Sequence, residues 1–116
     1  MENCNINVKI GCDIVKVRRF DNIKKNSLLK IFHENEISDR KSETVAGLFA
    51  AKESCRKVFN KLEWHDIMIK RMRSGKPSLS IDLDKIGEVQ IVNCDLSISH
   101  DGDYAIAMAV FLVKYL

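Results

Sequence analysis

The sequence lacks the features that mark several large classes of protein. Its four cysteines include no CxxC pair and no spacing typical of a zinc site or a disulfide framework. No stretch approaches the roughly 18 apolar residues of a membrane-spanning helix, and the first residues lack the basic and apolar regions of a signal peptide. The net charge of +3 is well below the basic excess of a dedicated nucleic-acid binder. We therefore expect a cytoplasmic protein with reduced, mostly buried thiols, and with neither a membrane nor a nucleic acid as its partner.

Signs of internal division are also missing. The 116 residues contain no internal repeat, low-complexity segment or linker. With 46% apolar residues, the chain is long enough for one compact core and too short for two ordinary domains. We therefore expect residues 1–116 to form a single domain.

The first predicted element is a strand over residues 6–14, where apolar and polar residues alternate. A period of two is typical of a strand with one buried face. The pattern predicts that the apolar side chains are buried and that Asp13 points away from them. The apolar set is Ile6, Val8, Ile10, Cys12 and Ile14. Short helical regions are expected next, around residues 17–25 and 28–32, and residues 33–40 are ambiguous.

The main predicted helix covers residues 42–62, which contain no proline, one glycine and many helix-forming residues. On a helical wheel, Ala46, Ala50, Glu53 and Lys57 fall together on one flank of the apolar stripe. The two alanines would let a bulky group approach the helix backbone there. The apolar stripe consists of Val45, Leu48, Phe49, Cys55, Val58, Phe59 and Leu62.

The rest of the chain is predicted to be an antiparallel set of strands. Alternating or β-rich runs cover residues 66–72, 79–83, 90–100 and 104–116. Residues 74–77 are a turn by composition, and Asp101-Gly102 is a strong hairpin signal. Because helices come early and strands late, the predicted fold class is α+β, with one long helix packed on an antiparallel sheet.

Asp13 and Glu53 form the first candidate site. Packing the long helix on the sheet could bring the two carboxylates together, and two carboxylates, water and substrate phosphates are the usual ligands of Mg²⁺. Lys57, one turn after Glu53, could neutralise a phosphate on the same metal. The alternative is that Asp13 lies in solvent and Glu53 pairs with Lys57 on an exposed face. Spacing alone favours this alternative, because exposed pairs are common.

Two other pairs are weaker candidates. Lys52 and Arg56 fall near the apolar arc of the helix, so they either extend to solvent from the edge of the core or bind an anion. Ser99 and His100 end a strand just before a hairpin turn, where the imidazole could donate to a phosphate. A histidine with no role is the more common case.

Basic residues also occur in a turn and in a surface run. The glycine of Ser74-Gly75-Lys76-Pro77 permits close approach of a ligand and Lys76 adds charge, but the segment is not a P-loop. The run is either a solvated face or a docking patch for an acidic partner. It consists of Lys16, Arg18, Arg19, Lys24 and Lys25.

Taken together and in order, five motifs resemble the holo-acyl-carrier-protein synthase family, the small 4′-phosphopantetheinyl transferases. They cover nearly the whole chain, and although each is modest alone, their joint order and spacing are specific. The motifs are Gly11-Cys12-Asp13-Ile14-Val15 followed by Arg19-Phe20; Phe32-His33-Glu34-Asn35-Glu36-Ile37; Ala46-Gly47-Leu48-Phe49-Ala50-Ala51-Lys52-Glu53 continuing to Lys57; Gly75-Lys76-Pro77; and Leu96-Ser97-Ile98-Ser99-His100 leading into Asp103-Tyr104-Ala105.

The resemblance implies an α+β homotrimer that binds coenzyme A and Mg²⁺ in active sites between neighbouring protomers. In this family a serine hydroxyl of an acyl carrier protein attacks the phosphate that bears the pantetheine arm, and adenosine 3′,5′-bisphosphate leaves. No residue stands out as a general base for the serine. Metal-bound water or a carboxylate such as Glu53 could serve.

The resemblance also implies roles for single residues. By motif position, Asp13 and Glu53 match the metal ligands and Lys57 matches the lysine near the pyrophosphate, and with His100 these are the expected catalytic residues. The expected carrier-docking residues are Arg18 and Arg19. The expected cofactor-binding residues are Lys52, Lys57, Lys76, Pro77, Ser99 and His100.

Two positions depart from the family's pattern. The family commonly has Gly-Arg-Phe where this chain has Gly47-Leu48-Phe49, which removes a cationic contact to a phosphate unless Lys52, Arg56 or a neighbouring protomer compensates. Phe59-Asn60 replaces a frequent glycine, although asparagine can also adopt the left-handed conformation that ends helices.

Two further hypotheses of function follow from these observations. The departure at Leu48 motivates a non-catalytic protein that binds a carrier protein or coenzyme A on the same fold. A small RNA-binding domain is suggested only by the positive charge, and few aromatic residues are apparent for base stacking.

Overall fold

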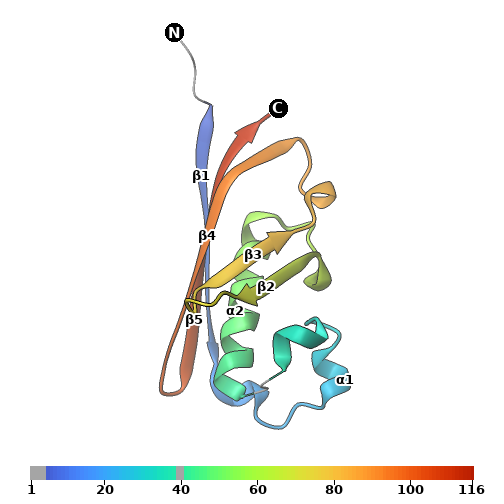
Figure 1. The fold of residues 1–116 in the computed structure, drawn as a ribbon, viewed down its shortest axis with the longest axis vertical. Helices are drawn as coiled ribbons and strands as arrows, with labels where there is room; N and C mark the ends of the chain where they lie inside the picture. The colour runs from blue at the N-terminus through green and yellow to red at the C-terminus, as the bar shows by residue number, and fades with distance from the viewer. Residues whose placement is uncertain (1–4, 39–40) are drawn as a thin grey trace.

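The computed structural model describes residues 5–38 and 41–116. A three-stranded antiparallel sheet, a long helix on one of its faces and a separate two-stranded hairpin make up the fold (Figure 1). The α+β class predicted from the sequence is therefore confirmed. Within the described residues, no helix is long and apolar enough to span a membrane.

The long sheet has the strand order β1-β5-β4. Its members are β1 (Ile6–Lys16), β4 (Val89–Asp101) and β5 (Tyr104–Tyr115). Strands β4 and β5 are joined at Gly102, whose φ of 59° is in the left-handed region. The predicted Asp101-Gly102 hairpin is therefore confirmed, and it sets the register that places β5 between its two neighbours.

Helix α2 (Ser42–Val58) lies along one face of this sheet (Figure 1). It ends four residues before the predicted Leu62, because Phe59 leaves the helical conformation at φ −120° and ψ 89°. Leu62 is still fully buried, but from the loop that follows the helix. Because Leu62 is apolar and has helical spacing from the residues before it, the sequence pattern predicted one more turn of helix than the structure has.

The prediction of which face of β1 is buried is wrong. Val8 and Ile14 are 65% and 61% exposed, whereas Gly11 is buried beneath α2 and Asp13, on the same face, is half-buried. Alternation defines two faces of a strand without saying which one a helix covers. Helix α2 packs on the face that carries Gly11 because glycine has no Cβ. A Cβ at this position would collide with the backbone carbonyl of Ser54.

The two-stranded hairpin lies beside α2 (Figure 1). It consists of β2 (Ile67–Arg71) and β3 (Pro77–Ile81), and Gly75 in the turn has a φ of 88°. The strand predicted over residues 79–83 extends too far at its C-terminal end, because Leu83–Lys85 form the short helix η4. The carboxylate of Asp82 accepts the Asp84 N–H at 3.1 Å and so begins that turn of helix.

Short helical segments connect these parts and bury Phe20, Leu28 and Phe32. The predicted helical regions around residues 17–25 and 28–32 contain η1 and the end of α1, and the ambiguous region contains η2. Residues 39–40 of that region lie outside the described residues. The segments are η1 (Val17–Phe20), α1 (Lys25–Leu28), η2 (Glu34–Ile37) and η3 (Trp64–Asp66).

The described cysteines are free thiols with different environments. Cys55 is buried, and burial raises its pKa to about 12. Cys94 is half-buried, but Cys12 is exposed on the outer face of β1, against the prediction of a buried thiol. Cys4 lies outside the described residues.

Candidate functional site

Asp13 and Lys57 meet where α2 crosses β1. The Lys57 ammonium donates to Asp13 Oδ1 at 3.2 Å and to the backbone carbonyl of Cys12 at 2.8 Å. The Asp13 side chain is 17% exposed, so its carboxylate is partly desolvated yet open to solvent on one side. The contact joins residues far apart in the sequence and depends on the close approach at Gly11.

Glu53 lies one helical turn before Lys57, and it pairs with Arg56. The Arg56 Nη1 is 3.4 Å from Glu53 Oε1, and its Nε donates to the Leu62 carbonyl at 2.9 Å. The alternative of a Glu53–Lys57 pair is therefore not what the structure shows. Each carboxylate is paired with a cation of α2, Asp13 with Lys57 and Glu53 with Arg56.

This donor set fits Mg²⁺ held jointly with a substrate. Asp13 and Glu53 supply hard carboxylate oxygens, and both side chains are partly exposed. Among the described residues, no three His, Cys, Asp or Glu side chains gather in a way that could hold a metal. Mg²⁺ commonly takes only one or two protein carboxylates and completes its shell with water and phosphate oxygens. The residues therefore fit a Mg²⁺ that is shared with the phosphates of a substrate better than a metal that is held by protein ligands alone.

A pocket of about 590 Å³ opens on the other side of α2, between this helix, the hairpin and β4. We call it the α2–β2 pocket. Its walls combine apolar, acidic and basic groups. They are formed by Asn35, Glu36, Ser38, Glu43, Thr44, Gly47, Leu48, Ile69, Lys70, Arg71, Gly75, Pro77, Ile98 and His100.

Some of the predicted cofactor-binding residues gather in this pocket and others do not. Pro77 and His100 line it, and His100 Nδ1 is 3.6 Å from Glu43 Oε2. Lys76 instead pairs with Asp95 at 3.1 Å. Ser99 is opposite the exposed Ile106 in the sheet register, so it lies on the face of β4 away from α2. Neighbouring residues of a strand point to opposite faces, which separates Ser99 from His100.

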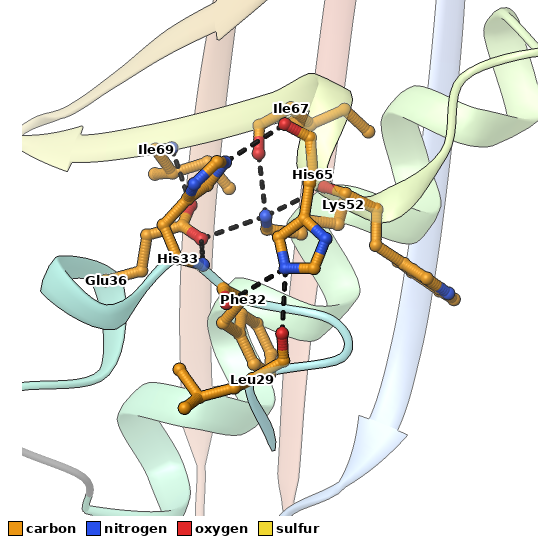
Figure 2. A network of polar contacts seen from close by, with 9 residues as sticks. Leu29, Phe32, His33, Glu36, Lys52, His65, Ile67 and Ile69 are labelled. Carbon is orange, nitrogen blue, oxygen red and sulfur yellow. Dashed lines mark hydrogen bonds and ion pairs between the residues drawn. The ribbon is translucent and has the colours of Figure 1, made fainter. Parts of the chain in front are cut away.

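Lys52 is a buried structural group, contrary to the prediction of a cofactor contact. Its side chain is 0% exposed, and its ammonium lies 2.9 Å from Glu36 Oε1, 3.0 Å from the Trp64 carbonyl and 2.6 Å from the Ile67 carbonyl (Figure 2). These contacts use its three N–H donors. Burial lowers the pKa of Lys52, and the hydrogen bond to Glu36 opposes that effect.

Glu36 completes this network from η2. Its carboxylate accepts the backbone N–H of His33 at 2.7 Å and that of Ile69 at 2.8 Å (Figure 2). The network therefore ties η2, α2 and β2 together behind the α2–β2 pocket. Nothing in the sequence identified Glu36 as the ion-pair partner of Lys52. The position of Lys52 near the apolar arc of the helix did indicate that its charge would need a partner.

Two histidines extend the same network. The His65 Nε2 faces the carbonyls of Leu29 and Phe32 at 2.8 and 3.2 Å, so it must carry a proton and donate. The His33 Nε2 faces the carbonyl of His65 at 3.0 Å (Figure 2). These bonds fix the segment before η2 against the loop after α2.

Arg19 belongs to a row of aromatic contacts that ends near Glu53. Its guanidinium lies 5.2 Å from the centroid of Phe49, which stacks on Trp64 at 5.3 Å. The Arg56 guanidinium in turn lies 4.3 Å from the centroid of the Trp64 ring. Arg56 is also the ion-pair partner of Glu53. Arg18 is exposed beside Arg19. Sequence reasoning missed Trp64, because a single tryptophan in a loop carries no periodic signal.

The chain matches a family model described as the 4′-phosphopantetheinyl transferase superfamily over residues 9–109. It is 35% identical to a holo-[acyl-carrier-protein] synthase of Sulfurovum sp. (strain NBC37-1), over 88% of this chain and 94% of that protein. It is 36% identical to the enzyme of the same name from Nautilia profundicola, over 90% of this chain and 99% of that protein.

Solved structures show the same likeness. The crystal structure of Helicobacter pylori holo-[acyl-carrier-protein] synthase in complex with coenzyme A has a TM-score of 0.79 and 31% identity, and the match covers 89% of this chain and 99% of that one. The Bacillus anthracis synthase in complex with CoA (3′,5′-ADP) has a TM-score of 0.73 and 30% identity, with 89% and 94% covered. The chain therefore belongs to the holo-[acyl-carrier-protein] synthase family of the 4′-phosphopantetheinyl transferase superfamily.

Proposed function

We propose that the chain transfers the 4′-phosphopantetheine arm of coenzyme A to a serine of an apo acyl carrier protein, in a Mg²⁺-dependent reaction. The observation that carries this proposal is the meeting of Asp13 with Lys57, one turn from Glu53. A carboxylate and an ammonium in contact, with a second carboxylate one turn away on α2, suit a reaction on a diphosphate. The names of the relatives, and the coenzyme A bound to two of the solved ones, support the choice of substrates.

In the proposed reaction the serine oxygen bonds to the phosphorus that bears the pantetheine arm. The bond from that phosphorus to the bridging oxygen of the diphosphate breaks, adenosine 3′,5′-bisphosphate leaves with that oxygen, and the proton of the serine hydroxyl passes to solvent. Asp13 and Glu53 would hold Mg²⁺, which when bound would supply positive charge to the diphosphate. Lys57 adds a second positive charge beside Asp13 and stabilises the leaving group.

The nucleotide end of coenzyme A is proposed to occupy the α2–β2 pocket. Pro77 and Leu48 offer apolar surface to the base, and His100 offers a ring nitrogen to a phosphate. Ser99 and Lys76 lie outside this pocket, and we propose that they contact a cofactor bound between neighbouring protomers. Arg18 and Arg19 are proposed to dock the carrier, because both are basic and exposed.

A trimer is proposed because the chain leaves a large apolar surface uncovered. The outer face of the long sheet, defined as the side away from α2, has Val8, Ile10 and Ile14 on β1 and Ile106 and Met108 on β5, all exposed. Contiguous apolar surface of this kind is typical of an interface between subunits. The free thiols of the chain suit a reducing compartment, and we place the reaction in the cytoplasm.

The test is to incubate the protein with coenzyme A, Mg²⁺ and an apo acyl carrier protein and to weigh the carrier by mass spectrometry. We expect the carrier to gain one phosphopantetheine, with at least about a hundredfold lower rate for Glu53→Ala, since it removes a proposed ligand of the Mg²⁺ that offsets charge on the diphosphate. Glu34→Ala is the matched control, because Glu34 is a surface carboxylate paired with Lys25.

Two results would contradict the proposal. One is a wild-type protein that leaves the carrier's mass unchanged, and the other is a Glu53→Ala variant as fast as the wild type. Binding of coenzyme A without any transfer would favour the non-catalytic alternative that Leu48 motivates.

A further inference from the structure

Leu48 occupies the place in the α2–β2 pocket where a basic residue would be useful. It is half-buried and lines the same pocket as Pro77 and His100. An apolar side chain there cannot neutralise a phosphate. Lys52 cannot compensate because it is buried with Glu36, and Arg56 pairs with Glu53 and does not line the pocket.

Among residues 5–38 and 41–116, the basic groups that line the pocket are Lys70, Arg71 and His100. His100 already has a partner within the protein, because its Nδ1 is 3.6 Å from the carboxylate of Glu43. The remaining acid of the pocket, Glu36, is paired with Lys52. Lys70 and Arg71, both exposed on β2, are therefore the available positive charges in the part of the pocket wall that the structure describes.

Arg71 is the better placed of the two. Ile69 is 5% exposed and points to the core, and residues two apart on a strand share a face. Arg71 therefore points to the same side as Ile69, and its cross-strand partner is Pro77 of the pocket. Lys70 points to the opposite side. Across the described ranges, residues 5–38 and 41–116, no carboxylate pairs with Arg71.

We propose that Arg71 supplies the positive charge that binds the 3′-phosphate of coenzyme A, in place of a basic side chain at residue 48. This inference rests on the proposed function. A guanidinium suits the task because it binds phosphate through two parallel N–H donors. Leu48 and Lys57 are nine residues apart on α2, or roughly 13 Å at about 1.5 Å per residue. The diphosphate belongs near Lys57, so the phosphate beside Leu48 is the 3′-phosphate.

The test is a comparison of binding, which needs no turnover. Calorimetry measures the affinity of the wild type, Arg71→Ala and Arg73→Ala for coenzyme A and for 3′-dephospho-coenzyme A. Arg73 is the matched control, because it is equally exposed in the adjoining turn but does not line the pocket. We expect Arg71→Ala to weaken coenzyme A binding about 10- to 100-fold, as for a lost charged hydrogen bond, and to leave dephospho-coenzyme A binding unchanged.

A rescue variant separates this role from a structural one. Leu48→Arg combined with Arg71→Ala should recover most of the lost affinity for coenzyme A, because it returns a guanidinium to the same pocket from α2. Thermal unfolding should show all variants folded, since the changed residues are at least partly exposed.

Several results would overturn the inference. They are an Arg71→Ala variant that binds coenzyme A like the wild type, one that loses affinity for both ligands equally, and a wild type that binds neither ligand. Transfer to the carrier is measured separately. A wild type that transfers normally while Arg71→Ala shows no selective loss would refute this inference and leave the proposed function intact.

Discussion

The wall of the α2–β2 pocket depends on one buried ion pair. Lys52 and Glu36 are 2.9 Å apart and both side chains are 0% exposed. Glu36 also holds the N–H of Ile69, two residues before Arg71, so the pair fixes where β2 begins to line the pocket. Buried charges of this kind stabilise little relative to apolar residues, but the loss of one partner leaves the other uncompensated.

We expect Lys52→Met to lower the free energy of unfolding by about 3–5 kcal/mol, because the Glu36 charge stays buried without its partner. Urea unfolding measures the change. The control is Lys85→Met, which removes an ion pair with Asp66 from the protein surface and should cost far less, because water screens exposed ion pairs. A Lys52→Met protein as stable as the control variant would show that the pair carries no such role.

At the scale of elements, the site is made by the packing of α2 on β1. Gly11 lets the helix backbone come close at Ser54, and Gly47 does the same toward β4, where a Cβ would be 2.7 Å from Ile98 Cγ2. The distance between strand and helix decides whether Lys57 reaches Asp13. The close approach of Gly11 to Ser54 therefore positions the polar contact that Lys57 makes about one turn farther along α2.

We expect Gly11→Ala to destabilise the protein by about 1–3 kcal/mol, as in overpacked cores, and to slow transfer to the carrier by separating Lys57 from Asp13. Urea unfolding and the mass assay measure the two effects. Asn7→Ala on the same strand is exposed and should change stability by less than about 0.5 kcal/mol. Full stability and full activity of Gly11→Ala would mean that the helix does not need this close approach.

At the scale of the whole molecule, the outer face of the long sheet is the feature that the single chain leaves unexplained. Its apolar side chains lie opposite the face that α2 covers, and Ile10 among them is 59% exposed. Hydrophobic surface of this extent is costly in water. Association with other copies would remove it from solvent.

We expect the wild type to be a trimer by light scattering and Ile10→Glu to be a monomer, because a charge on the outer face must be desolvated at the interface. Circular dichroism should show the fold retained, and transfer to the carrier should be lost with the interface. Lys61→Glu, an exposed change in the loop after α2, should leave the trimer intact. A wild type that is monomeric at working concentrations would contradict the trimer.

Much of the local structure could be predicted from the sequence because it depends on local spacing. The period of α2, the strands around the Asp101-Gly102 hairpin and the α+β class follow from side chains a few residues apart. The family's motifs depend on order and spacing along the chain, so they too were accessible without coordinates. Element ends were less accurate, as at Val58, since buried loop residues continue a helical pattern.

Only the tertiary structure decided which face of each element is used. Alternation in β1 marked two faces, and the collision that a Cβ at Gly11 would make selected the one that α2 covers. Lys52 and Lys57 are both basic residues of one helix, yet Lys52 is buried with Glu36 and Lys57 reaches Asp13. Their partners come from other elements, and the distance between two elements is not encoded in the spacing of either one.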